Sequence, residues 1–152
     1  MATAGVALAA CAPGPPPGTG DPGNVRLHEL QAEPVVKELP PDSHLISRRS
    51  SPASWDTTYG GWSGPGVAVE FTSSLTIQHV FDFYATLAAK TGWQATGSSD
   101  FGLPDSWSKT YPSDNEADMD LYYGGERLAP GTVDSEPYNL DVGDSAIATT
   151  PG

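Results

Sequence analysis

Cysteine is almost absent from this sequence: Cys11 is the single one among 152 residues, so no disulfide can form within the chain. Bases are also scarce, because seven Lys and Arg residues accompany nineteen Asp and Glu residues and give a net charge of −12. From Asp100 onward there are eleven acids and two bases. Nucleic acids and anionic lipid surfaces repel such a chain. We therefore expect no nucleic-acid partner, and a charge that chiefly keeps the protein dissolved.

Long apolar runs are missing too, and the best candidate lies at the start of the chain. Residues 2–10 are small or apolar, far short of the roughly 20 residues needed to cross a bilayer, but typical of the central region of a signal peptide. Residues 8–11, Leu-Ala-Ala-Cys, resemble a bacterial lipobox, in which the signal is cleaved before a cysteine that then carries a lipid. Residues 1–10 contain no Lys or Arg. Either a basic segment precedes Met1, or this stretch is not a signal.

Proline and glycine dominate the segment after Cys11. Residues 12–23 contain nine of them, a composition that cannot pack and is typical of an extended tether. A tether directly after a lipidated cysteine holds a domain away from a membrane, so the two features support each other. We expect a signal peptide with its lipobox (1–11), a tether (12–24), a single α+β domain (25–145) and a flexible tail (146–152).

One segment has the pattern of an amphipathic helix, at about residues 76–91. Its apolar residues recur at the spacing of a helix with one buried face: Ile77, Val80, Phe81, Tyr84, Leu87 and Ala88. Thr76 can cap the N-terminus, and Gly92 stands where a left-handed residue ends a helix. The residues expected on the solvated face are Gln78, His79, Asp82, Thr86 and Lys90.

Short strands are predicted on both sides of this helix. Residues 44–48 and 66–71 precede it, and residues 107–111 and 117–123 follow it as a hairpin. Further candidates are a strand at 94–96, an edge strand at 138–142, and one helical turn at 34–39 that begins with Pro34. The order β-β-α-β-β favours an α+β fold, with an antiparallel sheet of four to five strands and the helix packed on one face.

Aromatic residues gather between the first two predicted strands, where Trp55, Tyr59 and Trp62 accompany several glycines. Three large rings on one loop can form a platform for a sugar ring or for an apolar partner surface. The alternative is structural: the rings fold over the sheet and close its open face. These three residues are the candidate binding site.

Metal chemistry has weak support in the sequence. Asp114, Glu116 and Asp118 alternate like the start of a calcium loop, but Met119 stands at the position that requires glycine, and no Glu closes the loop. We therefore expect no cofactor, and these three acids are the weak metal candidates. His44 and His79 do not have zinc-binding spacing. With nearby carboxylates, these histidines define the alternative function, a small metal-dependent or hydrolytic enzyme.

Several short motifs lie along residues 8–123. They are the Leu-Ala-Ala-Cys segment, the Pro/Gly tether, Pro40-Pro41-x-Ser43-x-Leu45-Ile46, Val67-x-Val69-x-Phe71, Val80-x-x-Phe83-Tyr84-x-x-Leu87, Gly92-Trp93 and Trp107-x-Lys109. Together they resemble small secreted or lipid-anchored actinobacterial proteins with no assigned function. The resemblance implies a location and a fold, and no chemistry.

These observations lead to one expected function. The chain is expected to be an acidic lipoprotein of the cell envelope, attached to the outer face of the cell membrane through a lipid on Cys11, or secreted if the lipobox is not used. As a non-enzymatic binding or accessory domain, it would take an envelope ligand or protein. No residue is assigned a catalytic role.

Overall fold

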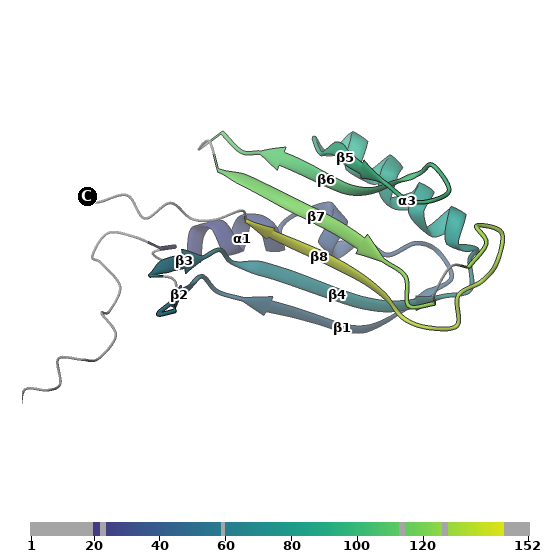
Figure 1. The fold of residues 1–152 in the computed structure, drawn as a ribbon, viewed down its shortest axis with the longest axis horizontal. Helices are drawn as coiled ribbons and strands as arrows, with labels where there is room; N and C mark the ends of the chain where they lie inside the picture. The colour runs from purple at the N-terminus through teal and green to yellow at the C-terminus, as the bar shows by residue number, and fades with distance from the viewer. Residues whose placement is uncertain (1–19, 22–23, 59, 113–114, 126–127, 145–152) are drawn as a thin grey trace, which may run out of the picture.

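The computed structural model of the chain describes residues 20–21, 24–58, 60–112, 115–125 and 128–144. These residues form an α+β fold built on a six-stranded antiparallel sheet (Figure 1). Its strands are β1 (Ser43–Ser51), β4 (Gly66–Ser73), β5 (Gln94–Ser98), β6 (Pro104–Thr110), β7 (Glu116–Tyr122) and β8 (Tyr138–Asp144). The other elements are α1 (Val25–Gln31), α2 (Pro34–Lys37), α3 (Ile77–Lys90) and a two-stranded sheet of β2 (Ser54–Asp56) and β3 (Gly61–Ser63).

The strand order of the large sheet is β1-β4-β8-β7-β6-β5. The predicted α+β class, the antiparallel sheet and the main helix are confirmed. The predicted number of strands, four to five, is too small. The predicted edge position of residues 138–142 is also wrong, because β8 pairs with β4 on one side and with β7 on the other. Its buried residues Tyr138, Leu140 and Val142 contribute to the core, as a central strand requires.

The helices cover one face of the large sheet. Along β4, Val67, Val69 and Phe71 are buried, and the residues between them are partly exposed. Successive side chains of a strand point to opposite faces, so the buried set marks the helix side. Helix α3 contacts β5 and β6, and α1 contacts β1, β4 and β8. Both helices lie behind the sheet in Figure 1, and the core lies between them and the sheet.

Both ends of α3 are set by local sequence. The Thr76 side chain accepts a hydrogen bond from the His79 backbone N–H at 3.3 Å, which satisfies a donor that the first turn leaves unpaired. At the other end Gly92 has a φ of +91°, and the Trp93 N–H donates to the Ala88 carbonyl at 3.0 Å. This bond closes a Schellman ending. The predicted helix and its caps are confirmed.

The sequence does not predict α1, and its cap explains why. Asn24 occupies the N-cap position but its side chain makes no capping hydrogen bond. The carboxylate of Asp21, three residues earlier, accepts from the backbone N–H groups of Arg26 at 2.9 Å and Leu27 at 3.1 Å. No standard capping pattern has this spacing, and seven residues are too few for a clear period. The single turn predicted with Pro34 at its start is confirmed as α2.

A small hairpin lies within the segment that the sequence presents as a connection. Strands β2 and β3 pair with Trp55 opposite Trp62, at one end of the large sheet (Figure 1). The described chain begins beside it, because a Cβ on Gly20 would lie 2.9 Å from the Trp62 ring. Among the described helices, none has both the length and the apolar character needed to span a bilayer.

Candidate binding surface

The second face of the large sheet carries no helix, and no described element crosses in front of it in Figure 1. We call it the open face. The register of the strands places the open-face side chains in rows. The central row, from β1 to β6, contains Arg49, Ala68, Asp141, Asp120 and Ser106.

The centre of the open face is acidic. Asp120 stands directly opposite Asp141 where β7 pairs with β8. Asp118 and Glu70 lie diagonal to Asp141, each two residues along a neighbouring strand. Like charges directly opposite one another destabilise a sheet. The open face therefore holds an electrostatically unfavourable pair at its centre, with Arg49 as the base in the same row.

The pKa values of the open face reflect this charge. Burial raises the pKa of the Asp141 carboxyl, the charge of Asp120 raises it further, and Arg49 opposes both effects. The pKa of Tyr122 on the same face is raised by burial and then by the charges of Asp120 and Asp141. Ser106 Oγ donates a hydrogen bond of 2.8 Å to Asp120 Oδ1, which fixes that carboxylate. The centre of the open face thus has a negative potential.

A hollow of about 610 Å³ lies on this face. Gly66 and Gly143 line it and stand opposite each other in the pairing of β4 with β8, so its floor there is backbone. A Cβ on Gly66 would lie 3.3 Å from the Val142 carbonyl oxygen, which leaves little room for a side chain. The charged side chains of the open face that line the hollow are Arg49, Asp118, Asp120 and Asp141; Asp144 also borders the hollow, but its carboxylate is buried beside Arg26. A ligand can approach the backbone of the sheet closely at this position.

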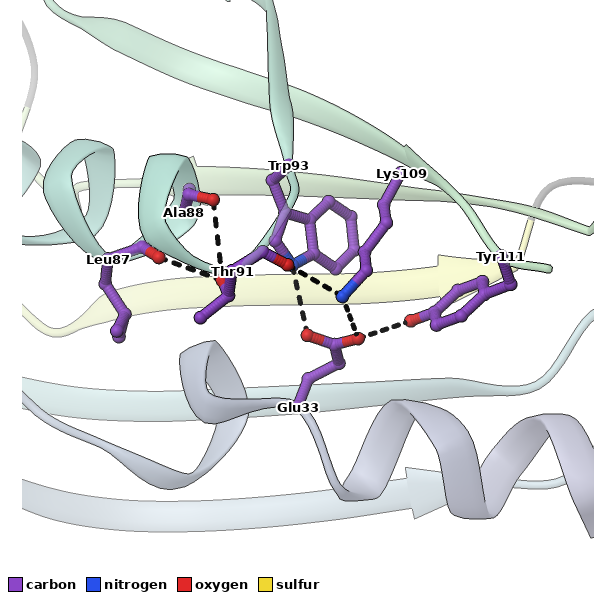
Figure 2. A network of polar contacts seen from close by, with 7 residues as sticks. All are labelled: Glu33, Leu87, Ala88, Thr91, Trp93, Lys109 and Tyr111. Carbon is purple, nitrogen blue, oxygen red and sulfur yellow. Dashed lines mark hydrogen bonds and ion pairs between the residues drawn. The ribbon is translucent and has the colours of Figure 1, made fainter.

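A second polar cluster lies on the helix side, around the buried Glu33 (Figure 2). Its carboxylate accepts hydrogen bonds from Lys109 Nζ at 2.7 Å, Tyr111 OH at 2.9 Å and Trp93 Nε1 at 3.2 Å. Lys109 also donates to the Thr91 carbonyl at 2.8 Å. Burial and the bond to Glu33 raise the pKa of Tyr111 well above its usual range. Because each polar group has a partner, this cluster joins the α1–α2 junction to β6 and to the end of α3, and its role is structural.

The outer side of α3 carries a groove of about 660 Å³. The residues predicted for the solvated face of this helix are exposed, as expected: Gln78, His79, Asp82, Thr86 and Lys90. The half-buried apolar side chains of Leu75, Phe83 and Leu87 lie among them and line the groove. Its charged residues are of both signs, so charge does not indicate an occupant.

The aromatic candidates are only partly described. Trp55 and Trp62 are half-buried, and their rings contact each other edge to face with centroids 5.6 Å apart. Tyr59 lies outside the described residues. The hairpin therefore brings two of the three rings together at the end of the sheet, and the platform of three rings stays a prediction.

The remaining candidates lie apart. His44 lines a hollow of about 310 Å³ beside β1 and β4, whereas His79 lines the groove on α3. Glu116 and Asp118 share the open face of β7; Asp114 and Cys11 lie outside the described residues. Among the residues that the structure describes, no group of three or more His, Cys, Asp or Glu side chains is arranged to hold a metal ion. The enzyme alternative with His44 and His79 stays a prediction that no contact between them supports.

Sequence analysis identified part of the open face and missed the rest. The alternation of Asp118 and Asp120 with the apolar Met119 and Leu121 predicts that these two acids point away from the core, and the structure confirms this. Alternation with Val69 and Phe71 likewise predicts Glu70 on the face away from the core, which is confirmed, and the same reasoning could have placed Asp141 there. No sequence rule gave the register that sets Asp141 beside Asp120, because that depends on β8 entering the sheet between β4 and β7.

Comparison of the chain with protein families, with curated proteins and with solved structures found no match. The resemblance to lipid-anchored actinobacterial proteins therefore stays a prediction, and function is argued from the surface itself.

Proposed function

We propose that this chain is a lipid-anchored, extracytoplasmic binding domain of the cell envelope, without enzymatic activity, and that the open face of its sheet is the surface that binds. The observation that carries the proposal is that no described element covers this face. One side of the six-stranded sheet packs against helices, and the other presents a hollow with a backbone floor and charged walls. The lipobox-like segment before Cys11 and the Pro/Gly run after it support the anchored location.

The anchor is tested by mass spectrometry of the N-terminus. The full chain is produced in a bacterial host that processes lipoproteins, beside a Cys11→Ser variant. We expect the first chain to begin at a diacylglyceryl-modified Cys11 and to sediment with membranes, and the variant to lack the lipid. A Cys11 that stays unmodified both in this chain and in one with a basic segment added before Met1 contradicts the anchored location.

The binding surface is tested by photo-crosslinking in the same cells. A photo-reactive phenylalanine analogue replaces Ala68, which lines the hollow, and in a control it replaces Asp82 on the exposed side of α3. We expect a discrete crosslinked product from position 68 and none from position 82. Equal products from both positions, or none from position 68, contradict the proposal that the open face is the binding surface.

A further inference from the structure

The open face has a charge pattern that selects among partners. No described helix or loop covers this sheet surface, which has a hollow, and four carboxylates lie around its centre: Glu70, Asp118, Asp120 and Asp141. A second copy of the chain is a poor occupant, because two such faces would bring like charges together. Nucleic acids and anionic membranes are repelled for the same reason. Charge complementarity requires a partner that carries cations.

The spacing of the carboxylates bears on the size of that partner. Glu70 on β4 and Asp118 on β7 are separated by two strand spacings across the sheet and by four residues along it. With about 4.8 Å between strands and about 3.4 Å per residue, they lie roughly 17 Å apart. A single metal ion contacts ligands within about 2.6 Å, so it cannot engage the set. A chain with several cations along its length can.

The centre of the face gives a specific place for one cation. Asp120 and Asp141 stand opposite each other, and Ser106 holds the Asp120 carboxylate in position. A Lys or Arg side chain that enters between the two carboxylates relieves their repulsion and gains two charge-assisted hydrogen bonds. The glycine floor beside them lets the backbone of the partner approach the sheet.

We propose that the open face binds a Lys- or Arg-bearing polypeptide segment of another protein, with one cationic side chain between Asp120 and Asp141. This inference rests on the proposed function and names the partner of the same surface. Arg49 then limits which segments can bind. It is the base in the central row, it opposes the charge-induced rise in the pKa of Asp141, and it repels a cationic segment that reaches beyond Ala68.

The test uses the purified full chain and a fluorescent peptide in which lysine and glycine alternate, with binding measured by fluorescence anisotropy. Asp120→Asn combined with Asp141→Asn should weaken binding about fivefold. The matched control, Glu38→Gln combined with Asp82→Asn, removes the same charge from exposed residues at the α3 groove and should weaken binding by less than about twofold. Arg49→Gln should tighten binding about twofold, because it removes repulsion. Asparagine can still accept the bond from Ser106, so the open-face variant should fold.

Four results overturn the inference. If the control variant weakens peptide binding equally, the peptide is attracted by the overall negative charge of the protein and does not bind at the open face specifically. Weaker binding after Arg49→Gln shows that Arg49 does not repel the peptide and that charge complementarity does not govern binding. Binding of spermine as tight as that of the peptide shows that a small polyamine is sufficient. If the peptide does not bind but position 68 still crosslinks in cells, the chemistry of the partner is wrong and the proposed function stands; if both fail, both are wrong.

Discussion

At the scale of single residues, Glu33 is the most informative side chain. It is the buried acid that accepts from Lys109, Trp93 and Tyr111, three residues that come from later parts of the chain. In the sequence Glu33 is one more acid before a proline, and nothing local shows that it is buried. Its importance follows from tertiary contacts, which is why sequence analysis missed it.

Replacement of this carboxylate should be costly. In Glu33→Gln, Lys109 loses its counter-ion in a site where its side chain is 20% exposed, and the new amide N–H₂ faces the Trp93 N–H donor. Breaking such a pair from one side destabilises a protein by about 3 kcal/mol. We expect that loss in the free energy of unfolding measured by urea. Glu38→Gln, an exposed acid five residues later, should change it by less than about 0.5 kcal/mol. Equal stability of the two variants contradicts a structural role for Glu33.

Asp144 gives a prediction about pH. Its side chain is 2% exposed, the nearest cation (Arg26 Nε) is 3.7 Å from Oδ2, and that oxygen has no hydrogen-bond partner among the described residues. Burial raises the pKa of this carboxyl from 3.8 to about 6, an effect that Arg26 opposes. A carboxyl with a higher pKa in the folded chain binds its proton more readily there. Its contribution to stability is therefore greatest below pH 3.8 and is lost as pH rises to about 6.

The measurement compares the wild type with Asp144→Asn by urea unfolding across this range. One pKa unit corresponds to about 1.4 kcal/mol. When the pH is lowered from about 7 to about 4, the free energy of unfolding of the wild type should therefore increase by on the order of 2 kcal/mol relative to that of the variant. Subtracting the variant removes the contributions of the other acids. Parallel pH profiles would show that Asp144 titrates normally.

At the scale of elements, a helix or strand could be predicted from the sequence when the contacts that determine it lie within a few residues. Helix α3 was predicted with its caps because Thr76, Gly92 and the apolar spacing between them act within a few residues. Helix α1 was missed because its cap comes from Asp21, outside the usual spacing. The strand β8 was recognised but misplaced, because alternation shows which side chains are buried and does not show the neighbouring strands.

The C-terminal end of α3 can be tested with one glycine. At Gly92 the φ of +91° is strained for any residue with a Cβ, although the nearest atom to that Cβ, Lys109 Cε, would lie at an ordinary 3.6 Å. Gly92→Ala should therefore destabilise the protein by about 1 kcal/mol through backbone strain alone. The control is Gly131→Ala, where the φ is unstrained and no atom lies within 4 Å of a Cβ. It should melt within about 1 °C of the wild type. A similar loss of stability in both variants would show that the positive φ at Gly92 is not the cause.

At the scale of the whole molecule, the strands of the sheet differ in protection, which decreases from the inner strands to the two edge strands. β4, β8, β7 and β6 each have a strand on both sides, whereas β1 and β5 form the edges. β1 has a bulge between Leu45 and Ser47, and β5 has two irregularities in its pairing with β6. Bulges and charges such as Arg48 and Arg49 on an edge strand discourage pairing with other chains.

The rate of hydrogen exchange, measured by mass spectrometry, should follow this difference between inner and edge strands. Peptides from β4, β7 and β8 are expected to exchange slowest, because their amides open only with the whole sheet. Peptides from β1, β5 and the β2–β3 hairpin are expected to exchange faster by at least about tenfold. Slow exchange at β1 in the isolated chain would contradict its edge position and indicate pairing with a second molecule.

The position of β8 also has a consequence for biosynthesis. Within the described sheet, the strands β4 and β7 are joined by strand pairing only through β8, whose residues are the last of that sheet to leave the ribosome. Until Tyr138–Asp144 has emerged, the sheet exists as two halves with unpaired edges, and the core between them cannot close. The native fold is therefore acquired after synthesis of this region is complete. Before β8 joins, neither half of the described sheet has a complete core, so its strands become protected together when this last strand pairs.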